Sequence, residues 1–315
     1  MVLFTILIIS HGHEELLSKC LDSINPGRED WEIIIVANGK VLPESFKRRA
    51  KIIDTSALLT PGEARNLGIK ESSGKWIFFL GEDTYLGSRY WEYALPLLET
   101  PKLDVVGGPA LAAKGMGFIP QSLAIALASP FCTGATFSRY QGLGQKLITA
   151  DEEKLTDLNL WVKKDLFEHS AFPEDFLRGE EILLLQDLKL EGAGIYYHPR
   201  LLVYQFHRES ARDFFWEGFY RSRLMKRKTG IGPEVFWLPV LFVLLHLTIL
   251  IAPEIFFSMA RLYAGIIVFV SMGLSMRSRK PWLFPFVSFF HYFVVFIYGV
   301  GFIAERLKFV QKRLR

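Results

Sequence analysis

Cysteine is nearly absent from the 315-residue chain, which contains only Cys20 and Cys132. Two cysteines provide neither a disulfide framework nor a zinc pattern, so the chain fits a reducing compartment. Internal repeats and low-complexity linkers are also absent, which excludes a repeat architecture. Residues 1–9 lack the basic start and the small-residue cleavage site of a signal peptide. We therefore expect the N-terminal domain to remain in the cytoplasm.

Charge is scarce in one part of the sequence. The only charged residues in 236–304 are Glu254, Arg261 and those of the basic cluster at 277–280. A hydrocarbon core of ~30 Å needs about 20 helical residues. Three apolar stretches approach or exceed that length and are expected to span a membrane: 236–252, 255–276 and 282–304. The expected parts of the chain are a cytoplasmic domain at 1–228, a transmembrane region at 229–304 and a basic tail at 305–315.

Basic residues complicate the orientation of these spans. Clusters at 226–228, 277–280 and 308–315 each favour the cytoplasmic side. Three spans place the last cluster outside, so either the tail departs from this rule or residues 282–304 are re-entrant or interfacial. We expect three spans and a multi-pass protein of the cell membrane. The net charge of +4 is concentrated near the C-terminus. This favours membrane lipids as partners over nucleic acid, unless the tail is simply solvated.

Residues 1–228 alternate apolar strands with helices. Strands are expected at 3–9, 32–36, 52–53, 76–80, 104–106 and 157–162, and helices at 14–24, 60–72, 88–98, 180–190 and 210–227. Thr60 and Glu63 provide the start signal of the second helix. Residues 195–204 are expected to form paired strands, and 114–149 give no clear assignment. The alternation predicts an α/β fold with a doubly wound, mostly parallel sheet, in which ligands bind at the carboxyl ends of the strands.

Several segments of this domain resemble family 2 glycosyltransferases with the GT-A fold. They are TILIIS at 5–10, EIIIVANGK at 32–40, GEARNLGI at 62–69, GKWIFFLGED at 74–83, and Gly179-Glu180-Glu181 before an apolar helix. Residues 129–131, the helix at 209–227 and the C-terminal apolar stretches are most similar to the membrane-bound branch that makes exopolysaccharides such as succinoglycan. The resemblance covers roughly residues 3–250.

The resemblance implies roles for four residues. Asp83 matches the last acid of the D-x-D motif, which holds Mg²⁺ or Mn²⁺ on the donor diphosphate. Glu181 matches the general base, and Glu180 precedes it; adjacent acids can raise one another's pKa, which suits a general base. Arg65 matches an arginine that contacts the nucleotide. Each residue also has a purely structural interpretation. Asp83 would cap a turn, Glu180 and Glu181 would form a solvated helix start, and Arg65 would be a salt-bridge partner.

Further residues are expected to contact the nucleotide-sugar, a UDP- or GDP-sugar: Ser10, His11, Asn38, Asp54 and Glu82. His207 is either a metal or phosphate ligand or a structural histidine. Arg221 and Arg223 either bind the diphosphate of the donor or the lipid phosphate of an acceptor, or lie at the interface without a ligand.

Two positions depart from the family pattern. Ala37 and Gly81 stand where aspartates usually contact the base and the ribose or metal, so Asp54 and Glu82 are the expected substitutes. We expect an inverting, metal-dependent hexosyltransferase that acts on a lipid-linked or growing cell-surface saccharide at the cytoplasmic membrane face. The alternatives are a polyprenyl-phosphate glycosyltransferase and a non-catalytic membrane scaffold.

Overall fold

The computed structural model describes residues 2–142, 144, 146–207, 210–229 and 237–307. Contacts within the chain divide it into two units. The first unit comprises Met1–Lys114 and Ser138–Phe206, and the second comprises Gly115–Phe137 and His207–Arg315. This grouping differs from the expected boundary at 228, because an inserted segment and the helix after Phe206 group with the C-terminal helices. The expected start of the transmembrane region, at 229, borders residues 230–236, which lie outside the described residues.

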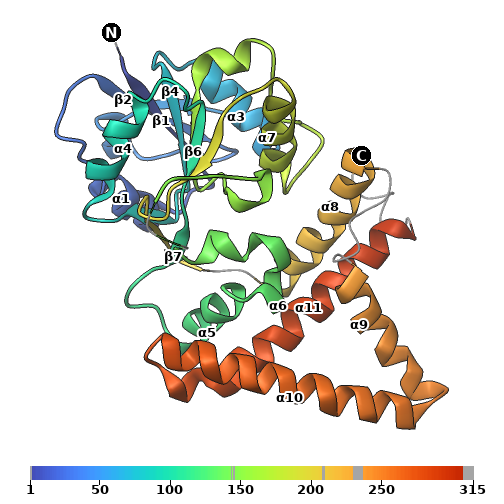
Figure 1. The fold of residues 1–315 in the computed structure, drawn as a ribbon. Helices are drawn as coiled ribbons and strands as arrows, with labels where there is room; N and C mark the ends of the chain where they lie inside the picture. Colours follow the sequence, from blue (N-terminus) through green and yellow to red (C-terminus); the bar gives the residue numbers. More distant parts are fainter. Residues whose placement is uncertain (1, 143, 145, 208–209, 230–236, 308–315) are drawn as a thin grey trace. The chain divides into compact units, whose positions relative to one another are not determined.

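The first unit is built on an eight-stranded mixed sheet (Figure 1). Its strand order is β3-β2-β1-β4-β9-β6-β10-β8. The strands are β1 (Phe4–Ser10), β2 (Trp31–Ala37), β3 (Lys51–Asp54), β4 (Trp76–Leu80), β6 (Val105–Gly107), β8 (Ile148–Thr149), β9 (Asn159–Lys163) and β10 (Ile195–Tyr197). The pairings among β1 to β4 and between β6 and β10 are parallel, whereas β9 runs antiparallel to both of its neighbours. β8 is also antiparallel to its neighbour β10, so four of the seven pairings are parallel and the sheet is mixed. The predicted α/β fold is confirmed.

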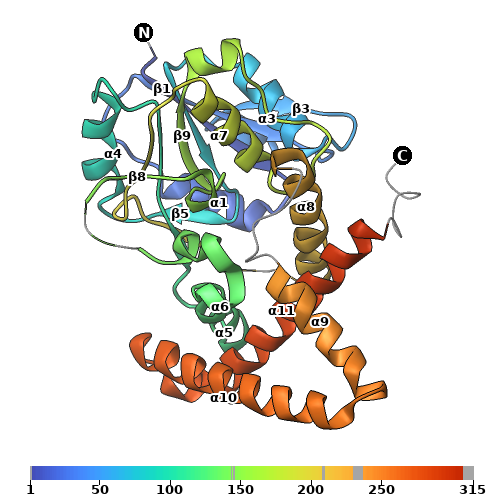
Figure 2. The same cartoon turned by 45° about the vertical axis from the view of Figure 1, so that its right-hand side comes forward.

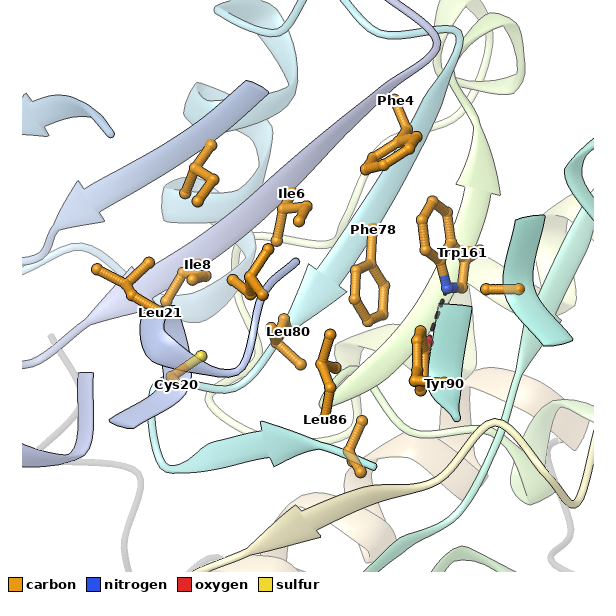
Figure 3. Packing of buried hydrophobic residues seen from close by; sticks show 14 of the residues in the cluster. Phe4, Ile6, Ile8, Cys20, Leu21, Phe78, Leu80, Leu86, Tyr90 and Trp161 are labelled. Carbon is orange, nitrogen blue, oxygen red and sulfur yellow. Dashed lines mark hydrogen bonds between the residues drawn. The ribbon is translucent and has the colours of Figure 1, made fainter. Parts of the chain in front are cut away.

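Helices cover both faces of this sheet, as the nearly continuous apolar strands require. One face carries α1 (Glu14–Asp22) and α4 (Tyr90–Leu98), and the other carries α3 (Pro61–Lys70) and α7 (Glu180–Leu190) (Figures 1 and 2). On the first face, the rings of Phe78 and Trp161 stack with centroids 4.3 Å apart, and Trp161 Nε1 donates to Tyr90 Oη at 2.8 Å (Figure 3). Truncating such a buried aromatic side chain typically costs ~3–5 kcal/mol.

The start of α3 confirms the predicted capping motif. The Thr60 hydroxyl accepts from Glu63 N at 3.2 Å, and the Glu63 carboxylate accepts from Thr60 N at 2.7 Å. Capping of this kind contributes about 1 kcal/mol. A Cβ on Gly68 would lie 2.3 Å from Leu7 Cδ1, so α3 packs directly on β1. This packing fixes the position of Arg65, one turn earlier on α3.

The expected pairing of strands within residues 195–204 is wrong. β10 pairs with β6 and β8 in the large sheet, whereas β11 (Val203–Gln205) pairs with β5 (Thr84–Leu86) and β7 (Ala110–Ala112) in a separate three-stranded sheet. The chain changes sheets where Leu201 crosses Gly108. A Cβ on Gly108 would lie 2.2 Å from Leu201 O, so the lack of a side chain permits the crossing.

The second unit is helical. Its helices are α5 (Phe118–Leu127), α6 (Pro130–Thr133), α8 (Ala211–Thr229), α9 (Trp237–Leu247), α10 (Pro253–Arg277) and α11 (Phe284–Arg306). In the described part of the chain, two helical segments are long and apolar enough to cross a membrane, Pro253–Arg277 and Pro281–Arg306. The helix in the first expected span, α9, has only 11 residues. The first expected span ends before Pro253, which is the first residue of α10, because proline suits the first turn of a helix.

Candidate functional site

The carboxyl ends of β1, β2 and β3 lie side by side. Ser10, the last residue of β1, is in register with Ala37 of β2, which is in turn in register with Asp54 of β3. β4 continues this edge on the other side of β1. The strand-end segments expected to bind a ligand are therefore brought together at one edge of the sheet.

Glu82 organises the loop that follows β1. The Ser10 hydroxyl donates to Glu82 Oε2 at 2.8 Å, and the backbone N–H of His11 donates to the same oxygen at 3.2 Å. The other oxygen lies 2.6 Å from His13 Nδ1. Because Glu82 is buried and both of its oxygens are engaged, the structure gives it a positioning role in the loop. It does not present a free second carboxylate.

Asn38 is also engaged within the fold. Its side chain donates to Leu59 O at 2.9 Å and accepts from Leu59 N at 2.7 Å, so it pins the loop that enters α3. Asp54 differs, because it is exposed and stands beside Ala37 in the strand register. Asp54 therefore has a more accessible side chain than Asn38.

Gly81 departs from the D-x-D pattern for a reason that the structure shows. A Cβ at this position would lie 2.7 Å from Leu158 Cδ2 and 3.0 Å from Asp83 Oδ1. An aspartate therefore does not fit unless Leu158 moves. The segment before β9 occupies the space that a first aspartate would need.

Asp83 suits a divalent ion better than Glu82. It follows β4, is half-buried, and its Oδ2 accepts from Gln205 Nε2 at 3.3 Å. The described residues contain no group of three His, Cys, Asp or Glu side chains that could hold a metal on their own. Mg²⁺ sites commonly combine one or two carboxylates with substrate phosphates. The single hard oxygen donor group of Asp83 fits an ion of that type, bound together with a diphosphate.

Arg65 joins three elements of the first unit. Its guanidinium forms ion pairs with Glu180 at the start of α7 and with Asp157 before β9, and it lies over the Phe172 ring at 5.2 Å. Arg65 is buried. The structure therefore brings Arg65 and Glu180 together as expected, but it engages the guanidinium in a salt-bridge network.

The two acids at the start of α7 have different partners. Burial raises the pKa of Glu180 to about 7; Arg65 opposes this shift, and the negative charges of Glu181 and Asp157 add to it. Glu181 is also buried, and its Oε1 lies 2.8 Å from Nη1 of Arg139. Each glutamate is thus held by its own arginine.

Sequence reasoning missed two members of this network, Asp157 and Arg139. Asp157 lies two residues before β9, and Asn159 pairs with Leu80 at the end of β4, so the antiparallel direction of β9 brings Asp157 to the strand-end edge. The sequence showed a strand there but not its direction. Arg139 belongs to a 3-10 helix (Gly134–Tyr140) in the region without a clear assignment. No local pattern marked it.

The remaining expected residues belong to the second unit. His207 is buried and directly follows Phe206, whose N–H donates to Asp83 O at 2.9 Å. Arg221 is buried and Arg223 is half-buried on α8. Their expected contacts with metal or phosphate remain predictions.

Comparison with known protein families finds a match in the N-terminal part of the chain. Residues 5–147 match the family described as "Glycosyl transferase family 2". They form a family 2 glycosyltransferase domain.

Two curated relatives agree with this assignment. The poly(ribitol-phosphate) beta-glucosyltransferase of Bacillus spizizenii is 27% identical over 135 residues, which are 38% of this chain and 20% of that protein. The uncharacterized glycosyltransferase EpsJ of Bacillus subtilis is 30% identical over 113 residues, 33% of each chain. The chain thus matches a third or less of the length of these relatives.

Solved structures extend the likeness of fold to nearly the whole chain. The mannosyltransferase PcManGT from Pyrobaculum calidifontis, in complex with GDP-Man and Mn²⁺, has a TM-score of 0.59 at 13% identity and covers 97% of this chain and 87% of its own. S. aureus TarS 1–349 has a TM-score of 0.51 at 14% identity, covering 98% and 92%. The fold of the glycosyltransferase domain is therefore GT-A-like, as predicted, with a mixed sheet. The family match ends before Asp157, Glu180 and Glu181, whose interpretation rests on the contacts described above.

Proposed function

We propose that this protein is an inverting glycosyltransferase. It transfers a sugar from a nucleotide diphosphate donor to a lipid-linked or growing polysaccharide at the cytoplasmic face of the cell membrane. One observation carries the proposal: Arg65 ties the acidic start of α7 to Asp157, beside the strand-end edge that carries Asp83. Asp83, which would face the donor phosphates, and the acids available for proton transfer, at the start of α7 and at Asp157, thus belong to one edge of the domain.

Glu181 is the proposed general base. In a direct displacement, the acceptor hydroxyl attacks the anomeric carbon, its proton passes to a carboxylate, and the nucleotide diphosphate leaves. One base suffices because no covalent intermediate forms. Arg139 holds the Glu181 carboxylate in place. Asp157 is the alternative base, because its side chain is 23% exposed compared with 5% for Glu181.

Asp83 is the proposed ligand for Mg²⁺ or Mn²⁺, together with the donor diphosphate. The bound ion supplies Lewis-acid neutralisation of the leaving diphosphate. Asp54 is the proposed base or ribose contact, since Ala37 beside it has no polar side chain. The Mn²⁺ and GDP-Man named for the mannosyltransferase structure support a donor and metal of this class.

Polysaccharide-type substrates and membrane attachment complete the proposal. A poly(ribitol-phosphate) glucosyltransferase among the relatives supports a polymeric or polymer-precursor acceptor. Two long apolar helices support attachment to the membrane. The glycosyltransferase domain lies on the cytoplasmic side, where nucleotide-sugars are available to it.

The test is a titration of the purified full-length protein with UDP- and GDP-sugars, with and without Mn²⁺. We expect metal-dependent binding of one donor class, and weaker metal dependence for Asp83→Asn. Asp165→Asn is the matched control, because Asp165 is exposed and follows the end of β9 that pairs with the start of β4. If no donor binds under either condition, the protein is a non-catalytic scaffold and the proposal is wrong.

A second measurement separates the two enzymatic alternatives. A lipid phosphate acceptor is already ionised and needs little help from a base, so a polyprenyl-phosphate glycosyltransferase would tolerate Glu181→Gln. Loss of transfer by Glu181→Gln with unchanged donor binding would favour a hydroxyl acceptor on a saccharide.

A further inference from the structure

α11 is the central helix of the second unit and has a different partner at each end (Figures 1 and 2). Near its beginning, the ring of Phe286 lies 5.1 Å from that of Phe118 on α5. Beside this contact, Leu283 and Val287 form a buried cluster with Ala126 of α5. The first two turns of α11 are therefore fixed against α5.

The other end of α11 packs against α8. The Ser222 hydroxyl of α8 donates to Glu305 at 3.0 Å. A Cβ on Gly301 would lie 1.9 Å from the carbonyl oxygen of Phe215, so the two helix backbones are in direct contact. Residues 286 and 305 are separated by ~29 Å along the axis, at ~1.5 Å per residue. α5 and α8 thus bracket a length close to the ~30 Å hydrocarbon core of a bilayer.

Both bracketing helices are joined to the glycosyltransferase domain by short links. Residues 115–117 connect Lys114 to α5, and residues 207–210 connect Phe206 to α8. An extended residue spans at most ~3.6 Å, so the links reach no more than ~14–18 Å, counting the bonds at both ends. Whatever the orientation of the two units, the first residues of α5 and α8 must lie on the same side of a membrane as the domain.

Charge supports the same conclusion. Arg277, Arg279 and Lys280 precede α11, and Arg306 ends it. Lys280 Nζ donates to Gln121 of α5 at 2.6 Å, so this basic turn lies at the level of α5. Positive clusters next to membrane helices favour the cytoplasmic side. A helix with basic residues at both ends satisfies this rule only if both ends face the cytoplasm.

Composition and burial distinguish α11 from α10. Nine of the 23 residues of α11 are Phe or Tyr, compared with four of the 25 of α10. Tyr is enriched in the interfacial layer of a bilayer, and Phe is common on the apolar face of helices that lie in that layer. In the most apolar window of each segment, 39% of the residues are buried for α11 and 11% for α10. α10 therefore needs lipid around it, whereas protein covers more of α11 than of α10.

From these observations, we propose that α11 does not cross the membrane but lies in the interfacial layer of the leaflet that faces the glycosyltransferase domain. Its partner is the lipid surface, and the hairpin of α9 and α10 is the part inserted into the hydrocarbon core. Of the two topologies that the sequence left open, this is the one with an interfacial third segment. The inference rests on the proposed membrane attachment but not on catalysis.

Single-cysteine labelling in sealed vesicles tests the topology. The variants use the full-length chain with Cys20→Ala and Cys132→Ala, and a membrane-impermeant maleimide. Val41→Cys marks the side of the glycosyltransferase domain, Ile251→Cys marks the turn before α10, and Trp282→Cys and Leu307→Cys mark the two ends of α11. All four native side chains are exposed.

We expect positions 282 and 307 to be labelled in the same vesicle orientation as position 41. Position 251 should resist labelling in both orientations until detergent is added, because Pro239 of α9 touches Gly299 of α11 and the 12 residues that follow Pro239 reach only ~18 Å, about the middle of the hydrocarbon core. Labelling of position 307 only in the vesicle orientation opposite to that of position 41 would show that α11 crosses and would overturn the inference. A protease-cleavable tag after Arg315, with the native cysteines retained, gives the same decision if the cysteine-free background does not fold. Release of the whole protein from membranes by alkaline carbonate would refute membrane insertion while leaving donor binding to be judged separately.

Discussion

The buried carboxyl group of Glu180 makes stability depend on pH. Burial raises its pKa from the ordinary value of 4.5 to about 7. The folded protein therefore holds this proton more tightly than the unfolded chain. The resulting stabilisation is fully present below pH 4.5 and is lost as the pH rises through 7. At ~1.4 kcal/mol per pH unit, the difference amounts to about 3 kcal/mol in the free energy of unfolding.

Glu180→Gln removes this dependence because glutamine does not titrate. The assay is thermal unfolding of the full-length protein in detergent between pH 4.5 and 8, followed by tryptophan fluorescence, to which the buried Trp161 contributes. The difference in unfolding free energy between wild type and variant should change by about 3 kcal/mol over this range, or ~6–12 °C in Tm. Glu44→Gln, at a side chain 81% exposed, is the matched control and should follow the wild type.

Two results would refute this reasoning. If wild type and Glu180→Gln change in parallel with pH, Glu180 is not the group that titrates in this range. If the wild type instead gains stability relative to the variant as the pH rises, the ion pair with Arg65 outweighs the cost of burial.

The other predictions concern proton transfer and the loops that shape the site. Glu181→Gln should lower kcat by ~10²–10⁴-fold and leave the Kd of the donor unchanged, as measured by single-turnover kinetics and calorimetry; if Asp157→Asn has this effect instead, Asp157 is the base. Arg139→Ala should lower kcat more than it changes KM, because the arginine orients Glu181, and Arg139→Lys should partly restore kcat. If the lysine and alanine variants lose kcat equally, a positive charge alone is not enough and orientation of Glu181 requires the guanidinium group. Asn38→Ala should destabilise the domain by ~1–3 kcal/mol in denaturant unfolding, because both backbone groups of Leu59 lose their partner. Unchanged stability would show that water replaces the amide.

The sequence was informative wherever a few neighbouring residues determine the structure. The apolar run of β1 and the capping signal of Thr60 and Glu63 predicted elements that the structure contains. The motif at 74–83 correctly placed a buried strand followed by Asp83. The acidic start of α7 was also correct. Each of these features is local, so the pattern itself holds the information.

Only the tertiary structure determined what these residues contact. Glu82 was expected to face the ligand, but Ser10, 72 residues earlier, accounts for one of its oxygens. Arg65 meets Glu180 across 115 residues of sequence. Arg139, which no pattern marked, holds Glu181. The direction of each strand determines which distant residues come into contact. Asp157, just before β9, reaches the strand-end edge only because β9 runs antiparallel to β4. A sequence pattern records the propensity of each segment, whereas the choice among distant partners depends on which packing buries the apolar faces and pairs the buried charges at the same time.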